Sequence, residues 1–125
     1  MPNKKLLAIV WNIMILFFCL INLSDINEVK RINIPNVDKI VHFVFYTVSS
    51  YLWLLAVLKG KVSKKATVTL VALGLILFGL TVEYLQDTFT VQRSFEWLDV
   101  LSNTLGVLFG TTVYLLYEKW KPRSL

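Results

Sequence analysis

The amino-acid sequence predicts an all-α membrane protein, a four-helix transmembrane bundle with both chain termini in the cytoplasm. Of the 125 residues, 56% are hydrophobic and the mean hydropathy is +0.63, which is too apolar for an ordinary soluble domain of this size. A helix rising about 1.5 Å per residue needs about 20 residues to cross a hydrocarbon layer of about 30 Å. Four such runs use most of the chain, so we expect a single membrane domain over residues 1–125.

Four apolar runs, separated by short polar connections, are the second observation behind this prediction. The first run follows Lys4 and Lys5 and has the basic start of a signal peptide. Its apolar stretch is longer than a typical signal core and no small-x-small cleavage site follows it, so we expect a retained helix. The predicted spans are about residues 6–23, 40–58, 66–85 and 98–117.

The distribution of Lys and Arg is the third observation, because cytoplasmic flanks and short loops carry the excess of positive residues. With both termini inside, nine of the thirteen basic residues are cytoplasmic, and seven of the eight acidic residues are outside. The inner basic residues are Lys4, Lys5, Lys59, Lys61, Lys64, Lys65, Lys119, Lys121 and Arg123.

The net charge of +5 does not indicate nucleic-acid binding, because the basic residues lie between apolar runs and form no single stripe. Cys19 is the one cysteine, so an intramolecular disulfide is excluded. Trp11, Trp97 and Trp120 lie near predicted span ends, where amphipathic rings commonly anchor at the membrane interface.

Polar side chains concentrate at the predicted outer ends of three helices. Asp38, His42 and Tyr46 are spaced i, i+4 and i+8, and each step of four turns a helix by only about 40°, so the three share one face. The third helix ends with Gly79, Glu83, Gln86 and Asp87, and the fourth begins with Asp99, Asn103, Gly106 and Gly110. Arg93 lies in the outer loop between them.

Each of these residues also has a structural interpretation. Asp38 and Asp99 could be helix caps, and His42 could bond a backbone carbonyl. Glu83 lies at a helix C-terminus, where the dipole disfavours an anion, so it should have a partner: Arg93, His42 or a bound cation. Gly106 and Gly110 form a small-xxx-small pair that permits close helix approach.

The order Asp38-Lys39-x-x-His42-x-x-x-Tyr46, Glu83-x-x-Gln86, Arg93, Asp99-x-x-x-Asn103-x-x-Gly106 resembles the VanZ-like family of bacterial membrane proteins. The resemblance covers about residues 38–110. It implies a small multi-pass protein of the bacterial plasma membrane, whose named member is associated with resistance to the glycopeptide antibiotic teicoplanin. It implies no particular reaction.

We expect a polar site near the outer face that recognises or modifies the head group of an envelope lipid or a lipid-linked cell-wall precursor. Asp38 and His42 would form an acid/base pair, because a carboxylate can fix the tautomer of an imidazole. Glu83 and Asp99 would assist proton transfer or bind a divalent cation. Arg93 would pair with a phosphate. The expected catalytic residues are Asp38, His42, Glu83 and Asp99, and the expected substrate-binding residues are Tyr46, Gln86, Arg93 and Asn103.

A non-catalytic function is the alternative interpretation of these residues. The same side chains would then form a hydrogen-bonded network that stabilises the bundle, and the protein would act by binding a partner or altering antibiotic access. Tyr46 suits a packing role in either case. The residues identify no cofactor, metal or oligomeric state, and they form no polar path across the membrane that a transporter would need.

Overall fold

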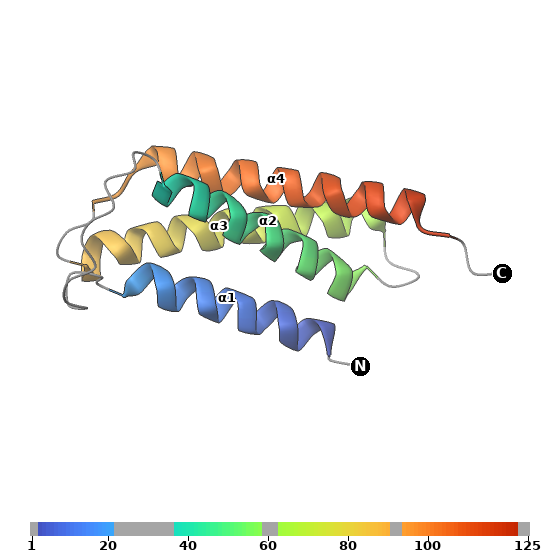
Figure 1. Cartoon of the computed structure of the whole chain (residues 1–125), viewed down its shortest axis with the longest axis horizontal. Helices are drawn as coiled ribbons and strands as arrows, with labels where there is room; N and C mark the ends of the chain where they lie inside the picture. The colour runs from blue at the N-terminus through green and yellow to red at the C-terminus, as the bar shows by residue number, and fades with distance from the viewer. Residues whose placement is uncertain (1–2, 22–36, 59–62, 91–93, 123–125) are drawn as a thin grey trace.

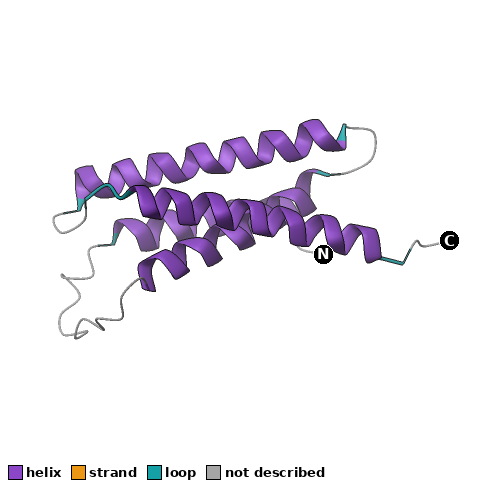
Figure 2. Cartoon of the chain, turned by 90° about the horizontal axis from the view of Figure 1, so that it is seen from above, coloured by secondary structure: helices purple, strands orange, loops and turns teal. Residues whose placement is uncertain are grey.

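The computed structural model describes residues 3–21, 37–58, 63–90 and 94–122, and in these ranges it contains four α-helices and no strand (Figures 1 and 2). They are α1 (Lys4–Leu20), α2 (Val37–Val57), α3 (Lys64–Phe89) and α4 (Trp97–Trp120). The prediction of an all-helical chain is therefore confirmed. Arg93 and most of the connection before α2 lie outside the described residues.

The helix ends differ from the predicted spans by a few residues, because polar residues continue the helices beyond their apolar runs. Asn3 begins α1, where its side chain accepts a hydrogen bond from the backbone N–H of Lys5 at 3.0 Å. Ser63 begins α3 in the same way, through the N–H of Ala66 at 3.4 Å. Both are favoured N-cap residues. The α3 helix also extends to Phe89, four residues beyond the predicted end at 85.

Three of the helices, α2, α3 and α4, are long and apolar enough to cross a membrane. The 17 residues of α1 span about 26 Å, slightly less than a hydrocarbon layer of about 30 Å. Its predicted span ran to residue 23, whereas the described helix ends at Leu20 with Ile21 as its C-cap. The crossing of the membrane by α1 stays a prediction.

The helices run alternately up and down along one long axis (Figure 1). Helices α1 and α3 terminate, and helices α2 and α4 begin, on the same side of the bundle. We call this side the site end. At the opposite end, α1 begins and α4 ends, so the start of the first helix and the end of the last lie on the same side of the bundle. This arrangement is the one that a topology with both termini inside requires, while the side that faces the cytoplasm stays a prediction.

The most extensive helix contact joins α2 and α4, and glycines make it possible. A Cβ on Gly106 would lie 2.4 Å from the backbone oxygen of Phe43, and one on Gly110 would lie 2.2 Å from that of Thr47. No side chain fits at such distances. The predicted close approach at these two glycines is confirmed, and it follows the small-residue packing common between membrane helices.

The first helix packs against α2 and α3 but not α4, and polar contacts attach it. The indole N–H of Trp11 donates to the backbone oxygen of Phe45 at 2.9 Å, and Ser49 donates to the side chain of Asn12. Trp11 therefore lies half-buried in the middle of α1, and the prediction that it anchors at an interface was wrong. Trp97 and Trp120, at the two ends of α4, are 72% and 80% exposed, as expected of interfacial residues.

Candidate functional site

The single histidine of the chain is held by an amide from the opposite helix. His42 and Asn103 are both buried, and the imidazole Nδ1 of His42 lies 2.9 Å from Oδ1 of Asn103. An amide oxygen only accepts, so Nδ1 carries a proton, and when the ring is neutral its lone pair lies on Nε2. The partner that orients His42 is thus Asn103 and not Asp38, whose side chain contacts Lys39. Asn103 was predicted to orient substrate, and the structure shows it orienting the imidazole.

Two carboxylates from different helices approach the imidazole. Ligand atoms of His42 on α2, Glu83 on α3 and Asp99 on α4 all lie within 4.8 Å of one another. All three residues are at least 95% buried. The structure therefore brings together three of the four predicted catalytic residues, each from a different helix, about two turns or less from the site end of α2, α3 and α4. We call His42, Glu83 and Asp99 the inner triad.

The position of Glu83 is explained by the start of the next helix. Its Oε1 accepts a hydrogen bond from the backbone N–H of Glu96, the N-cap residue of α4, at 3.2 Å. Free N–H groups and the positive end of the dipole make a helix N-terminus favourable for an anion. This backbone group was not among the partners predicted for Glu83. Asp87 adds a similar bond, to the N–H of Phe95 at 3.3 Å.

A second group of charges lies nearer the site end, around Lys39. Its ammonium lies 2.9 Å from Glu96, 3.4 Å from Asp38 and 3.4 Å from Oδ1 of Asp99. The side chains of Asp38 and Glu96 are 39% and 48% exposed, whereas that of Asp99 is 7% exposed. We call these four residues the outer cluster. Asp99 belongs to both groups, and it forms no side-chain cap of its helix in this position.

Below the inner triad, Tyr46 and Asn103 pack over a glycine. A Cβ on Gly79 would lie 3.1 Å from Nδ2 of Asn103 and 3.3 Å from Cε1 of Tyr46. Tyr46 is fully buried, and its hydroxyl has no hydrogen-bond partner among the described residues. Its ring packs against Gly79 beneath the triad, so it forms the floor of the site.

The remaining predicted residues have other surroundings. Gln86 donates from Nε2 to the backbone oxygen of Cys19 at 2.8 Å, and both residues are buried. This contact ties α3 to the end of α1 and indicates a structural role, where substrate orientation was predicted. Arg93, the predicted phosphate partner, lies outside the described residues.

Sequence reasoning assigned no role to Lys39, Glu96 or Gly79 in the site. Lys39 precedes His42 by three residues, so helical spacing could have placed it on the same face. Gly79 precedes Glu83 by four residues, which also marks one face. No helical spacing in the sequence places Glu96 at the site, because Glu96 lies outside the apolar repeat of α4.

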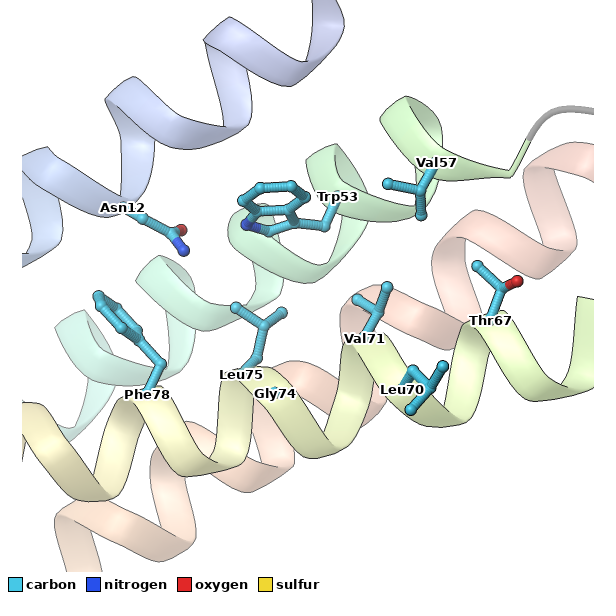
Figure 3. Close-up of a pocket in the computed structure, with 9 residues that line it drawn as sticks. All are labelled: Asn12, Trp53, Val57, Thr67, Leu70, Val71, Gly74, Leu75 and Phe78. Atoms are coloured by element: carbon cyan, nitrogen blue, oxygen red, sulfur yellow. The ribbon is translucent and has the colours of Figure 1, made fainter.

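An apolar groove elsewhere in the bundle is separate from this site. It has a volume of about 520 Å³ and lies between α1, α2 and α3, with Trp53 and Phe78 among its lining residues (Figure 3). It runs from Asn12, in the middle of α1, to Val57 and Thr67 near the end that is remote from the site. Its lining is almost entirely hydrocarbon, which suits contact with lipid chains and offers no acid/base chemistry.

Comparison with known proteins identifies the family. No curated protein and no solved structure matches the chain. The family model described as VanZ/LLP1 matches residues 5–118, which include all four helices up to the last turn of α4 and every residue of the site. The chain is therefore a member of the VanZ/LLP1 family.

Proposed function

We propose that this VanZ-like membrane protein uses the site to recognise, and chemically modify, the phosphate-bearing head group of an envelope lipid or a lipid-linked cell-wall precursor. The observation that carries the proposal is the buried His42–Asn103 pair beside two carboxylates, at one end of an apolar bundle. Burying a histidine and two acids is costly, and residues of this kind in membrane helices usually serve binding or proton transfer.

The imidazole is suited to a general base. Asn103 holds the proton on Nδ1, so the lone pair of Nε2 can accept a proton from a water molecule or a head-group hydroxyl. Glu83 and Asp99 lie close enough to stabilise the imidazolium that then forms. Asp38 no longer serves as the partner of His42 in this scheme, and its carboxylate balances the charge of Lys39.

Within the outer cluster, which holds three carboxylates and one ammonium, Lys39 is the residue suited to contact an anionic head group. Lys39 is a cation on the side of the site that is nearest to the membrane surface, and a phosphate would replace part of its carboxylate contacts. Arg93 lies in the adjoining connection of the chain and is proposed as a second phosphate ligand.

The excess of basic residues at the opposite end supports a plasma-membrane topology with both termini in the cytoplasm and four spans. The site would then open to the outer leaflet, where cell-wall precursors and glycopeptides meet the membrane. An effect on teicoplanin susceptibility is proposed on the same ground, together with the family membership.

Binding and turnover can be measured together with purified protein by native mass spectrometry. The probes are phosphatidylglycerol, a polyprenyl-pyrophosphate-linked disaccharide peptide, and phosphatidylcholine, whose head group has no net charge. We expect the first two to bind more tightly than the third, and Lys39→Gln to reduce that preference at least about 10-fold, the loss of one charge-assisted contact. Thr112→Ala, at an exposed position of α4, should bind like the parent.

A change in head-group mass during incubation, absent in His42→Ala, would establish modification in addition to recognition. Equal binding of all three probes would refute the proposal.

The side of the membrane that the site faces can be tested by labelling intact cells with a membrane-impermeant maleimide. Ser94→Cys should react, and Lys119→Cys should react only after permeabilisation. Cys19 is buried and gives a low background.

The non-catalytic alternative is favoured by a specific set of contacts. His42–Asn103, Glu83–Glu96 and Gln86–Cys19 each join two segments of the bundle. If variants of His42 and Glu83 lose their effect on teicoplanin susceptibility only in proportion to the fall in their amount in the membrane, these contacts serve stability. If the variants stay in the membrane at parental amounts and lose activity, the site acts on a ligand.

A further inference from the structure

We propose that the inner triad binds a divalent transition-metal ion, with Zn²⁺ as the best fit. Its residues come from three helices and supply one imidazole nitrogen and two carboxylates. Imidazole is a ligand for Zn²⁺, and carboxylate oxygens bind it as well, whereas Ca²⁺ and Mg²⁺ take oxygen ligands only. The mixed set therefore favours Zn²⁺ over the oxygen-bound cations. This inference goes beyond the proposed recognition of a head group and changes one part of it: with Zn²⁺ on Nε2, His42 is a metal ligand, and a metal-bound water would take its place as the base.

The geometry is close to that of a zinc site. Ligands about 2.0–2.2 Å from a tetrahedral Zn²⁺ are separated by roughly 3.4 Å, and the ligand atoms of the triad lie within 4.8 Å of one another. Rotation of two acidic side chains can close this difference. A carboxylate has two oxygens, so Asp99 can face Lys39 with one and a metal with the other, and the two cations then compete for its single negative charge.

The surroundings of the triad already have the form of an outer coordination shell. Metal-binding histidines almost always donate their other ring N–H to an oxygen, and Asn103 accepts such a bond from His42. The backbone N–H of Glu96 fixes the carboxylate of Glu83 in the same manner. The positive charge of Lys39 balances negative charge only in the outer cluster, where Lys39 forms ion pairs with Asp38, Glu96 and Asp99.

The fully buried hydroxyl of Tyr46 is an independent indication of a ligand. It has no hydrogen-bond partner among the described residues, and a buried polar atom without one costs about 1–3 kcal/mol. Helical side chains lean toward the helix N-terminus, so Tyr46 on α2 leans toward the site end, where the inner triad lies. The ring of Tyr46 also lies beside Asn103, because Cε1 of Tyr46 and Nδ2 of Asn103 lie 3.3 Å and 3.1 Å from a Cβ placed on Gly79. A water molecule on the metal would supply the missing partner of the hydroxyl.

Three protein ligands leave a fourth tetrahedral position, which is the arrangement of catalytic zinc sites and not of closed structural ones. The open position would hold water, or a phosphate oxygen of a bound head group.

The test uses purified protein without a polyhistidine tag, stripped with EDTA, desalted and titrated with ZnCl₂ by calorimetry. We expect one Zn²⁺ per chain. His42→Ala, Glu83→Gln and Asp99→Asn should each weaken binding at least about 10-fold, and Asn103→Ala by about 10–100-fold as the loss of an outer-shell partner. Each variant is compared with the parent by size-exclusion chromatography and thermal unfolding in EDTA.

The matched controls are Asp38→Asn and Glu96→Gln, which remove carboxylates of the outer cluster and leave the inner triad unchanged. They should bind Zn²⁺ within about 3-fold of the parent, a difference of less than 1 kcal/mol. Binding that is lost in these two variants and kept in the triad variants would overturn the proposal, as would a stoichiometry well below one.

A measurement on the parent chain does not depend on the folding of any variant. The chain has one histidine, so ¹⁵N-histidine labelling gives two ring resonances by NMR. One equivalent of Zn²⁺ should shift the Nε2 resonance strongly and leave Nδ1 protonated, and an unchanged Nε2 would overturn the proposal. Head-group binding is measured separately in EDTA, so its failure can be told apart from a failure to bind metal.

Discussion

Replacing Gly106 by Ala should separate α2 from α4 directly below the His42–Asn103 pair. A Cβ at this position would lie 2.4 Å from the backbone oxygen of Phe43, whereas an unstrained carbon–oxygen contact is about 3.3 Å. A backbone carbonyl inside a helix cannot turn aside, so the helices must move apart by about 0.9 Å. The 2.9 Å hydrogen bond between His42 and Asn103 would then lengthen to roughly 3.8 Å, beyond the range of a hydrogen bond.

The expected loss of stability follows from three contributions. Overpacking costs about 1–3 kcal/mol, and loss of a hydrogen bond between buried groups costs a further 1–3 kcal/mol or so. The better helix propensity of Ala returns about 1 kcal/mol. The free energy of unfolding in detergent should therefore fall by about 3 kcal/mol.

Gly74→Ala is the matched control on a neighbouring helix, because nothing lies within 4 Å of a Cβ added there. It should be neutral or stabilising by up to about 1 kcal/mol. Equilibrium unfolding gives the stability of both variants, and ¹⁵N-histidine NMR gives the tautomer of His42. If Gly106→Ala unfolds at the same free energy as Gly74→Ala and keeps the proton on Nδ1, the argument from close approach is refuted.

Three further predictions concern individual contacts. Asn103→Ala should release His42 from the Nδ1-protonated tautomer, which ¹⁵N NMR detects, and an unchanged tautomer would show that another group orients the ring. Gln86→Leu should loosen α1 by about 1 kcal/mol, because it removes the hydrogen bond from Nε2 of Gln86 to the backbone oxygen of Cys19. Faster hydrogen exchange confined to α1 is the readout, and uniform exchange would contradict it. Lys64→Ala removes an ion pair whose lysine is 55% exposed, so unfolding should change by no more than about 1 kcal/mol, and a larger change would indicate a buried network.

The helices could be predicted from the sequence because apolar length and charge distribution are local properties of the chain. The differences lie at helix ends, where single polar groups decide. Ser63 moves the start of α3 to Lys64 through a side-chain bond, and α3 continues to Phe89 although its last two turns contain Glu83, Gln86, Asp87 and Thr88. Span prediction from hydropathy ends a helix where the apolar residues end, but the backbone hydrogen bonds continue.

The site could be predicted as a set of residues but not as a set of contacts. Helical spacing placed His42, Glu83, Asp99 and Asn103 at one end, and the structure brings them together. Their pairing depends on how far each helix is rotated about its axis and on the α2–α4 distance, neither of which a one-dimensional pattern contains. The partner of Glu83 is a backbone N–H of Glu96, which no pattern of side chains reveals.

The inner triad and the outer cluster share Asp99, so a ligand bound by one group affects binding at the other. Asp99 pairs with Lys39 in the outer cluster and lies beside His42 and Glu83 in the inner triad. A phosphate at Lys39 would weaken the ion pair with Asp99 and leave that carboxylate more available to a metal ion. By linkage, a metal ion held by Asp99 would leave Lys39 more available to phosphate by the same factor. The proposed metal and the proposed head group should therefore bind with positive cooperativity, because Lys39 and the metal ion compete for the carboxylate of Asp99.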